Sequence, residues 1–323
     1  MKAFYSDEYV LPLPEGHRFP MRKYRLTRDL AVARVPDLEL LKPAPATRDE
    51  LQLAHASTYV DAVFGGALTP REQREIGFPW SVAMVERSRR SVGATLGAGR
   101  VAACEGIAIN LAGGTHHAYA DKGSGFCVFN DVAVTVRSMR RERERDGSRP
   151  WSYAVIDLDV HQGNGTAAIL AADDDVFTLS LHGEKNFPFR KEASTLDVGL
   201  PDGCEDAQYL DALDAALNTM LDRFAPDFVF YLAGADPYAG DRLGRLDLTV
   251  DGLADRDRRV FAFASSRGLP TAVAMAGGYG HVIEETCAIH AQTVALAAEY
   301  APLYLQHPSF REASHDASLT RIS

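Results

Sequence analysis

An apolar segment that begins at Tyr153 ends in acid and imidazole side chains, with Asp157, Asp159 and His161 at alternate positions. Side chains alternate along a strand, so these three can emerge on one side, where the strand stops and a glycine-rich loop begins. A polar strand end that caps the next helix is the simpler alternative. The apolar run predicts a buried strand, however, and buried carboxylates cost roughly several kcal/mol unless they are paired or bind a metal. The pattern therefore favours a metal site.

A third ligand can come from Asp236, which follows another apolar run through Gly234 and Ala235. Two carboxylates and one imidazole suit a divalent, zinc-like cation, because the ligand charges balance the metal and one position stays open for water or substrate. An open position indicates a catalytic site.

Further strand ends carry groups that can move protons or donate hydrogen bonds. His116 and His117 follow an apolar run and two glycines, and Tyr279 follows an apolar run and a glycine pair. Open parallel sheets bind their ligands at strand ends of this type. A core tyrosine is the alternative for Tyr279, but its place after the glycines favours a catalytic role.

Strands and helices that alternate along the chain must position these groups. Apolar segments predict strands at 107–111, 153–158, 176–181, 228–233 and 271–276. Apolar side chains at helical spacing from Leu210 to Phe224 predict a helix, and Thr47 and Thr69 resemble helix starts with capping boxes. This alternation is typical of a single α/β domain in which helices flank a doubly wound parallel sheet.

Other segments are expected to lie outside this pattern. Prolines recur through the first 45 residues, which we expect to be irregular, and residues 306–323 are expected to form a polar surface tail after a catalytic domain of residues 1–305. The mixed charges of 137–145 and 255–259 suit solvent-facing sides of helices better than nucleic-acid contacts. Histidines without a partner pattern are expected to be structural, namely His55, His182, His281 and His290.

Composition limits the class of protein. The chain has 323 residues, is 46% hydrophobic and carries a net charge of -10, which suits a soluble domain, disfavours nucleic acid and is compatible with cationic substrates. Its four cysteines contain no CxxC pair, so we expect reduced core residues and neither a disulfide framework nor a thiolate zinc site. No apolar run reaches the ~18 residues that cross a bilayer, and the first residues lack a signal core. We therefore expect a cytoplasmic protein with no membrane partner.

These motifs, taken in order, resemble those of the histone deacetylase superfamily of zinc amidohydrolases. They are GGTHH at 113–117, DLDVHQGNG at 157–165, AGADPYAGDRLG at 233–244 and AGGYG at 276–280. The resemblance extends from about Leu11 to Tyr300. Within the superfamily, HQGNG and the early GFPWS at 77–81 resemble class IV and its bacterial members. The resemblance implies an arginase/deacetylase-like fold.

The resemblance also implies roles for individual residues. Asp159, His161 and Asp236 would hold one catalytic zinc, His116 and His117 would manage the proton, and Tyr279 would stabilise the oxyanion. Asp157 would hydrogen-bond His116. Where class I enzymes carry a second aspartate, this chain has Asn164. His117 then faces a neutral partner and should ionise less readily, so which histidine acts as the base stays open.

Further residues are assigned by the same resemblance. A structural potassium ion is implied at a site formed by Asp157, Asp159, His161, Ser180 and Leu181. Gly125 with Phe126, and Phe187, resemble the aromatic walls of an acyl-lysine tunnel. Leu243 stands near the mouth, where polyamine-selective members are expected to carry an acid. Gly277 and Gly278 leave room beside the metal for an acyl chain.

Three functions follow. The favoured one is zinc-dependent hydrolysis of N6-acetyl- or N6-acyl-lysine, with longer acyl chains accepted as the class IV resemblance implies. An acetylpolyamine amidohydrolase would perform the same chemistry on a small amine. A non-catalytic acyl- or metal-binding scaffold would not need Tyr279 and both histidines. A binuclear manganese ureohydrolase would need bridging carboxylates that the sequence lacks.

Overall fold

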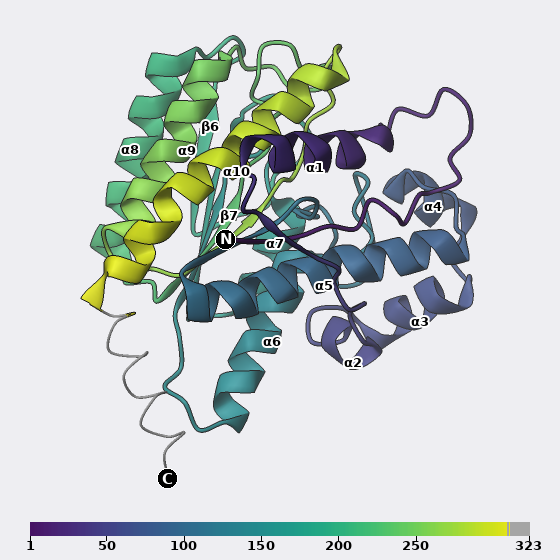
Figure 1. Cartoon of the computed structure of the whole chain (residues 1–323). Coiled ribbons are helices and arrows are strands. Elements are labelled where there is room, and N and C mark those ends of the chain that lie inside the picture. Colours follow the sequence, from purple (N-terminus) through teal and green to yellow (C-terminus); the bar gives the residue numbers. More distant parts are fainter. Residues whose placement is uncertain (309, 311–323) are drawn as a thin grey trace.

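Within residues 1–308 and 310, which this computed structural model describes, eight parallel strands form one sheet flanked by helices (Figure 1). The strand order is β2-β1-β3-β8-β7-β4-β5-β6. The strands are β1 (Lys2–Phe4), β2 (Glu39–Leu41), β3 (Ile107–Asn110), β4 (Tyr153–Asp157), β5 (Val176–Gly183), β6 (Leu196–Leu200), β7 (Phe228–Leu232) and β8 (Thr271–Ala274).

Helices cover both faces of this sheet. Figure 1 shows α8, α9 and α10 on one side and α5 and α6 on the other. The helices are α1 (Arg22–Arg34), α2 (Arg48–Leu51), α3 (Ser57–Gly65), α4 (Pro70–Ile76), α5 (Val82–Glu105), α6 (Asp131–Arg145), α7 (Asn164–Leu170), α8 (Asp206–Arg223), α9 (Val250–Ser265) and α10 (Ile283–Gln306). The doubly wound arrangement expected from the sequence is confirmed.

Alternation along each strand produces two separate cores. In β4, Ile156 belongs to a core shared with α8, α9 and α10, whereas Val155 belongs to one shared with α5 and α6. Both faces of the central strands are therefore apolar, which explains their continuous apolar runs. Because β3, β8, β7 and β4 are neighbours and run parallel, their carboxyl ends lie side by side at one edge of the sheet.

Local signals for helices were accurate. Thr47 and Thr69 each accept a hydrogen bond from the backbone of a glutamate three residues later, and each glutamate bonds back, so both capping boxes are present. The apolar stripe from Leu210 lies on α8 and faces the core. The five predicted strands all form, with ends that differ by up to two residues from the predicted ones.

The expectation of irregular structure in the first 45 residues is wrong. This segment contains β1, β2 and the 13-residue helix α1. The prolines lie outside α1, with Pro20 before it and Pro36 after it, so the intervening stretch is free to form a helix. Strand β6 was also missed, because its residues alternate between partly buried and exposed at the edge of the sheet.

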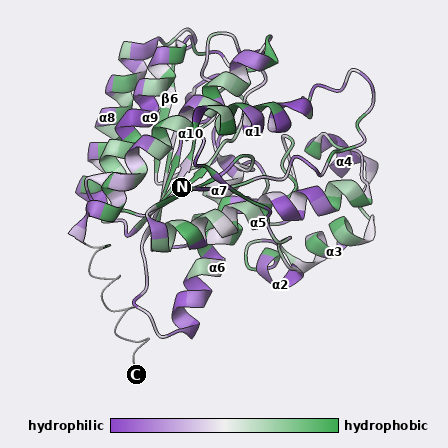
Figure 2. Ribbon diagram, viewed as in Figure 1, coloured by the Kyte–Doolittle hydropathy of each residue, from purple (hydrophilic) through white to green (hydrophobic). Residues whose placement is uncertain are grey.

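The solvent-facing interpretation of 255–259 is wrong for two of its residues. Arg256 and Asp257 are buried and form an ion pair of 2.8 Å, while Arg258 and Asp255 form an exposed pair as expected. Residues 137–145 follow the prediction better. Their helix, α6, is hydrophilic towards its end (Figure 2).

The remaining expectations concern cysteines, the membrane and the C-terminus. All four cysteines are free, and three are buried, but Cys104 is exposed and is not a core residue. None of the described helices is both long and apolar enough to cross a bilayer. The cytoplasmic location stays a prediction. Helix α10 extends to Gln306, Phe310 is buried, and the rest of the predicted tail, 309 and 311–323, lies outside the described residues.

Candidate active site

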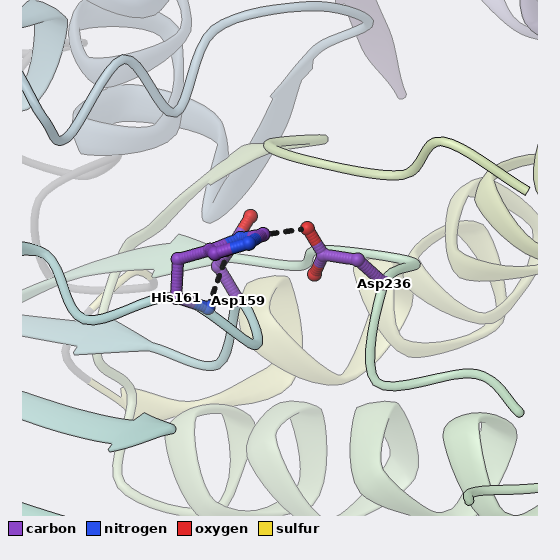
Figure 3. Close-up of side chains that lie close together, drawn as sticks. All are labelled: Asp159, His161 and Asp236. Atoms are coloured by element: carbon purple, nitrogen blue, oxygen red, sulfur yellow. Dashed lines mark hydrogen bonds and ion pairs between the residues drawn. The ribbon is translucent and has the colours of Figure 1, made fainter. Parts of the chain in front are cut away.

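The predicted metal ligands meet beyond the carboxyl ends of β4 and β7. Asp159 and His161 follow β4, and Asp236 follows β7, the adjacent strand in the sheet. One ligand atom from each residue lies within 4.8 Å of the others. In Figure 3 the His161 ring overlaps Asp159 and faces Asp236. His161 Nδ1 lies 3.0 Å from Asp159 Oδ1 and 3.4 Å from Asp236 Oδ2.

This donor set fits a divalent cation. All three side chains are buried, and Oδ2 of Asp236 has no hydrogen-bond partner within the described part of the chain. Among the described residues this oxygen has the ion pair with His161 at 3.4 Å but no hydrogen bond, which is costly for a buried carboxylate, and a cation would satisfy it. Two carboxylates and one imidazole balance the charge of a divalent ion and leave a coordination position open.

Backbone amides fix the orientation of both carboxylates. The Gly277 N–H donates to Asp159 Oδ2 at 2.7 Å, and the Val160 N–H donates to Asp236 Oδ1 at 2.9 Å. A Cβ on Gly277 would lie 2.0 Å from Asp236 Oδ2, so only glycine allows this close approach. The tyrosine-bearing loop after β8 is thereby joined directly to the proposed ligands.

Mutual charge governs ionisation among the ligands. Burial alone would lower the pKa of His161, but Asp159 and Asp236 outweigh it and raise that pKa to about 10. Burial and the charge of Asp159 raise the pKa of Asp236 to about 6, whereas the neighbouring imidazoles overcome burial and lower the pKa of Asp159. The carboxylates thus create a strongly negative site, and a bound cation would replace the proton that they favour on His161.

The two adjacent histidines have different environments. His116 Nδ1 lies 2.7 Å from Asp157 Oδ2, as predicted, and His117 Nδ1 lies 2.7 Å from Asn164 Oδ1. Burial opposes the charged form of His116, yet Asp157 and Asp159 raise its pKa to about 9. For His117, burial and then the charge of His116 lower the pKa well below its usual value. Near neutral pH, His117 is therefore the neutral imidazole of the pair.

Tyr279 reaches the same cavity from the loop after β8. Its ring lies 5.8 Å from that of Phe126 and 6.1 Å from that of Phe19, between centroids. Burial raises the pKa of Tyr279 well above its usual value, so the hydroxyl stays protonated and can donate a hydrogen bond. The Tyr279 N–H donates to Asp241 Oδ2 at 2.5 Å, which anchors the loop on its outer side.

One cavity of about 680 Å³ contains these groups. Of the residues expected to contact substrate, Gly125, Phe126, Phe187, Leu243 and Gly277 line it, whereas Gly278 does not. The cavity is also lined by all three proposed metal ligands, both histidines and Tyr279. The ring of Phe187 lies 4.9 Å from that of His117 between centroids, which places an aromatic wall beside the imidazole.

Of the residues predicted to bind potassium, Asp159 and His161 are also proposed metal ligands, and the other three lie on β4 and β5. Asp157 and Ser180 are opposite each other in the pairing of β4 with β5, and Leu181 follows. The Ser180 hydroxyl lies 3.0 Å from His182 Nδ1. Among the described residues, the ligand trio is the only cluster of histidine, cysteine and acidic groups spaced to hold a metal. The potassium site stays a prediction.

Sequence reasoning missed several residues that build the site. Phe19 and Phe78 line the cavity. Asp131, fully buried at the start of α6, accepts hydrogen bonds from the N–H groups of Gly114 and Thr115 and so fixes the loop that carries the histidines. An Asn-Asp pair directly before a helical segment was a usable signal for Asp131. Phe78 lies in the GFPWS motif at 77–81, which was noted without a role in the cavity, and no local pattern marked Phe19.

Buried Arg256 holds the loop that carries Asp236. Its Nη1 donates to the carbonyl oxygen of Gly234 at 2.6 Å, two residues before Asp236. Asp257, its ion-pair partner, also accepts a hydrogen bond from Thr293 at 2.6 Å.

Two of the histidines expected to be structural have different surroundings. Both nitrogens of His55 have hydrogen-bond partners, whereas both nitrogens of buried His290 lack hydrogen bonds to described residues.

Comparisons with known sequences agree on one family. A family model for the histone deacetylase domain matches residues 17–295. An uncharacterized protein of Picosynechococcus sp. is 43% identical over 283 residues, which cover 87% of this chain and 93% of that protein. Histone deacetylase 2 of Arabidopsis thaliana is 32% identical over 251 residues, 74% of this chain, and the match spans 63% of the plant protein.

Solved structures show the same fold. The crystal structure of an HDAC homolog complexed with SAHA superimposes with a TM-score of 0.77 and 26% identity, covering 93% of this chain and 84% of the other. The HDAC homolog from Aquifex aeolicus gives a TM-score of 0.76 at 25% identity over the same shares of the two chains. The arginase/deacetylase-like fold implied by the sequence is therefore confirmed.

Proposed function

This chain belongs to the histone deacetylase family, and we propose that it is a zinc-dependent hydrolase of N6-acyl-lysine side chains. One observation carries the proposal. A metal-ligand trio, a neutral imidazole and a protonated phenol all line one cavity with aromatic walls. Family membership supports deacetylase chemistry, and the choice of zinc and of lysine is our inference.

Asp159, His161 and Asp236 would hold the metal through the three buried ligand atoms described above. When bound, zinc would polarise the amide carbonyl and lower the pKa of its water towards neutrality. A potassium ion is part of the same proposal. Asp157 on β4 and Ser180, opposite it on β5, would be side-chain contacts of that ion.

His117 would accept the proton released by the attacking water, because it is the imidazole that is neutral near pH 7. Its hydrogen bond to Asn164 fixes the ring and determines which nitrogen faces the cavity. His116, held charged by Asp157, would stabilise negative charge and supply a proton to the departing amine. Each histidine thus has a distinct role.

Tyr279 would donate its hydroxyl to the oxygen that becomes negative as water adds to the amide carbon. Its raised pKa keeps the donor proton in place across the physiological range. Two anchors hold the backbone, from Asp159 to Gly277 and from Asp241 to Tyr279. A preset donor needs little reorganisation when charge develops.

Charge at the cavity supports acyl-lysine over acetylpolyamine. Exposed cations line the cavity, namely Arg18, Lys122, Lys185 and Arg245, and the last two pair with Asp202 at 3.7 and 3.2 Å. Among the described lining residues, Glu75 is the only exposed carboxylate, and it already pairs with Arg71 at 3.0 Å. A polyamine would bring further ammonium groups to these cations, and Leu243 offers no acid to bind them.

Acyl-chain length is a second question. Part of the cavity wall is apolar, including Leu11, Phe19, Phe78, Val128 and Phe129. Each buried methylene could contribute up to about 0.8 kcal/mol, so medium or long chains would gain over acetyl if they enter this part. The resemblance to class IV, which rests on HQGNG and on GFPWS at 77–81, is the source of this expectation.

One experiment separates these possibilities. Lysine peptides carrying acetyl to long acyl groups, and acetylated spermidine, are assayed with one preparation whose metal content is measured. We expect one zinc per chain, turnover of the peptides above that of acetylspermidine, and kcat/KM that rises with chain length. Faster turnover of acetylspermidine would favour the polyamine enzyme. Full zinc without any turnover would favour the scaffold, and a steady fall beyond acetyl would remove the long-chain preference.

A further inference from the structure

Lys23, in the first turn of α1, is a buried charged residue with no assigned role. Only 2% of it is exposed, and no described carboxylate forms an ion pair with it. Its Nζ lies 3.4 Å from the carbonyl oxygen of Ala276 and 3.3 Å from that of Gly278. An ammonium group buried without a counter-ion is costly unless hydrogen bonds and ring contacts offset the cost.

Those two carbonyls flank Gly277 in the loop that carries Tyr279. Ala276 has a φ of 52°, a left-handed conformation that is unfavourable for a residue with a side chain, and Gly278 has a φ of 138°. Strained backbone persists only where its surroundings hold it. Lys23, from α1, contacts the carbonyl oxygens of Ala276 and Gly278. The Asp159 carboxylate accepts a hydrogen bond from the Gly277 N–H between them.

The same ammonium contacts the catalytic ring itself. Its Nζ lies 5.2 Å from the centroid of the Tyr279 ring and 5.4 Å from that of Tyr24. A cation at this distance from an aromatic ring is attracted to it. Lys23 therefore restrains both the backbone before Tyr279 and the orientation of its ring.

We propose that Lys23 is a positioning residue for Tyr279, and this inference rests on the function proposed above. The residue does not touch the substrate. It holds the strained loop so that the hydroxyl meets the oxyanion, an interaction made chiefly in the transition state. Loss of Lys23 should therefore lower kcat and leave KM nearly unchanged.

The test is a double-mutant cycle between Lys23→Met and Tyr279→Phe. We expect Lys23→Met alone to lower kcat by about 10-fold or more, with KM within about 3-fold, and to lower the residual kcat of Tyr279→Phe by less than about 2-fold. Zinc content should stay complete. Lys23→Arg should restore part of the loss, and Arg25→Met, an exposed change on the same helix, should have no effect.

Equal losses in both backgrounds, or loss of zinc in Lys23→Met, would overturn the proposal, because Lys23 would then act on the fold or the metal. If Lys23→Met does not fold, Lys23→Gln replaces it in the cycle, because its shorter, uncharged side chain loses the attraction to the Tyr279 ring and should likewise lower kcat only where Tyr279 is intact. Hydrogen exchange of segment 275–281 provides a readout besides activity. It should accelerate in Lys23→Met and not in Arg25→Met, even if no acyl-lysine substrate is found, so failure of the proposed function can be told apart from failure of the role of Lys23.

Discussion

The inner and outer parts of the cavity are built differently. The inner part consists of buried groups beyond strand ends, where Asp159 and Asp236 are locked by backbone N–H groups. The outer part consists of loops with exposed side chains, including Phe187 at 36% and Phe189 at 87% exposure. We therefore propose that chemistry that needs fixed distances takes place in the inner part and that substrates are selected in the outer part. Substitutions in the inner part should abolish activity, whereas those in the outer part should only change the relative kcat/KM of different substrates.

The largest effect is expected for Asp236→Ala. Removal of one of three ligands should cost the metal and, with it, activity by about 10³-fold or more, since metal activation of the water is lost. Zinc analysis and kcat measured on the same sample check this. Asp255→Ala, at an exposed carboxylate paired with Arg258, is the control. A full complement of zinc in Asp236→Ala would remove Asp236 from the site and weaken the contrast between the two parts.

Tyr279→Phe should have the next largest effect. The change deletes one hydroxyl, leaves the ring contacts with Phe126 and Phe19, and should lower kcat by roughly 10²-fold if the hydroxyl is a main oxyanion donor. Zinc content and thermal stability should remain close to those of the wild type. Near-normal turnover would show that the tyrosine is structural.

Asn164→Asp should shift the pH dependence of the reaction. His117 must be neutral to accept a proton, and its lowered pKa keeps wild-type kcat/KM level as the pH falls to about 6.5. A carboxylate beside Nδ1 would favour protonated His117 and move the acid limb upwards by about one pH unit or more.

The matched control is Asn218→Asp, the same change at an exposed position on α8, which should leave the pH profile unchanged. An unshifted acid limb in Asn164→Asp would mean that His117 is not the base. The inner part would then depend on His116 for proton transfer.

Sequence alone predicted which residues meet in the inner part of the cavity. Asp159, His161 and Asp236 each follow an apolar run, and the parallel pairing of β4 with β7 brings those strand ends together, so local pattern and topology agree. Lys23 and Arg256 could not be found in this way. Their burial arises from packing between helices distant in sequence, and each acts on a loop carbonyl, which no local pattern of side chains records.

The smallest effect is expected at the outer part, from reversal of its exposed charges. In the wild type, acyl-lysine peptides with acidic flanks should have kcat/KM about 3- to 10-fold above peptides with basic flanks, since exposed pairs contribute about 0.2–1 kcal/mol each. Arg18→Glu combined with Lys122→Glu should reverse this preference, whereas Arg141→Glu, exposed on α6, should not. High salt should reduce the difference, because exposed charges are screened. A preference that survives both charge reversal and salt would place selection in the apolar walls, while a loss of turnover on every peptide would mean that these cations support the chemistry and that the two parts of the cavity are not separable.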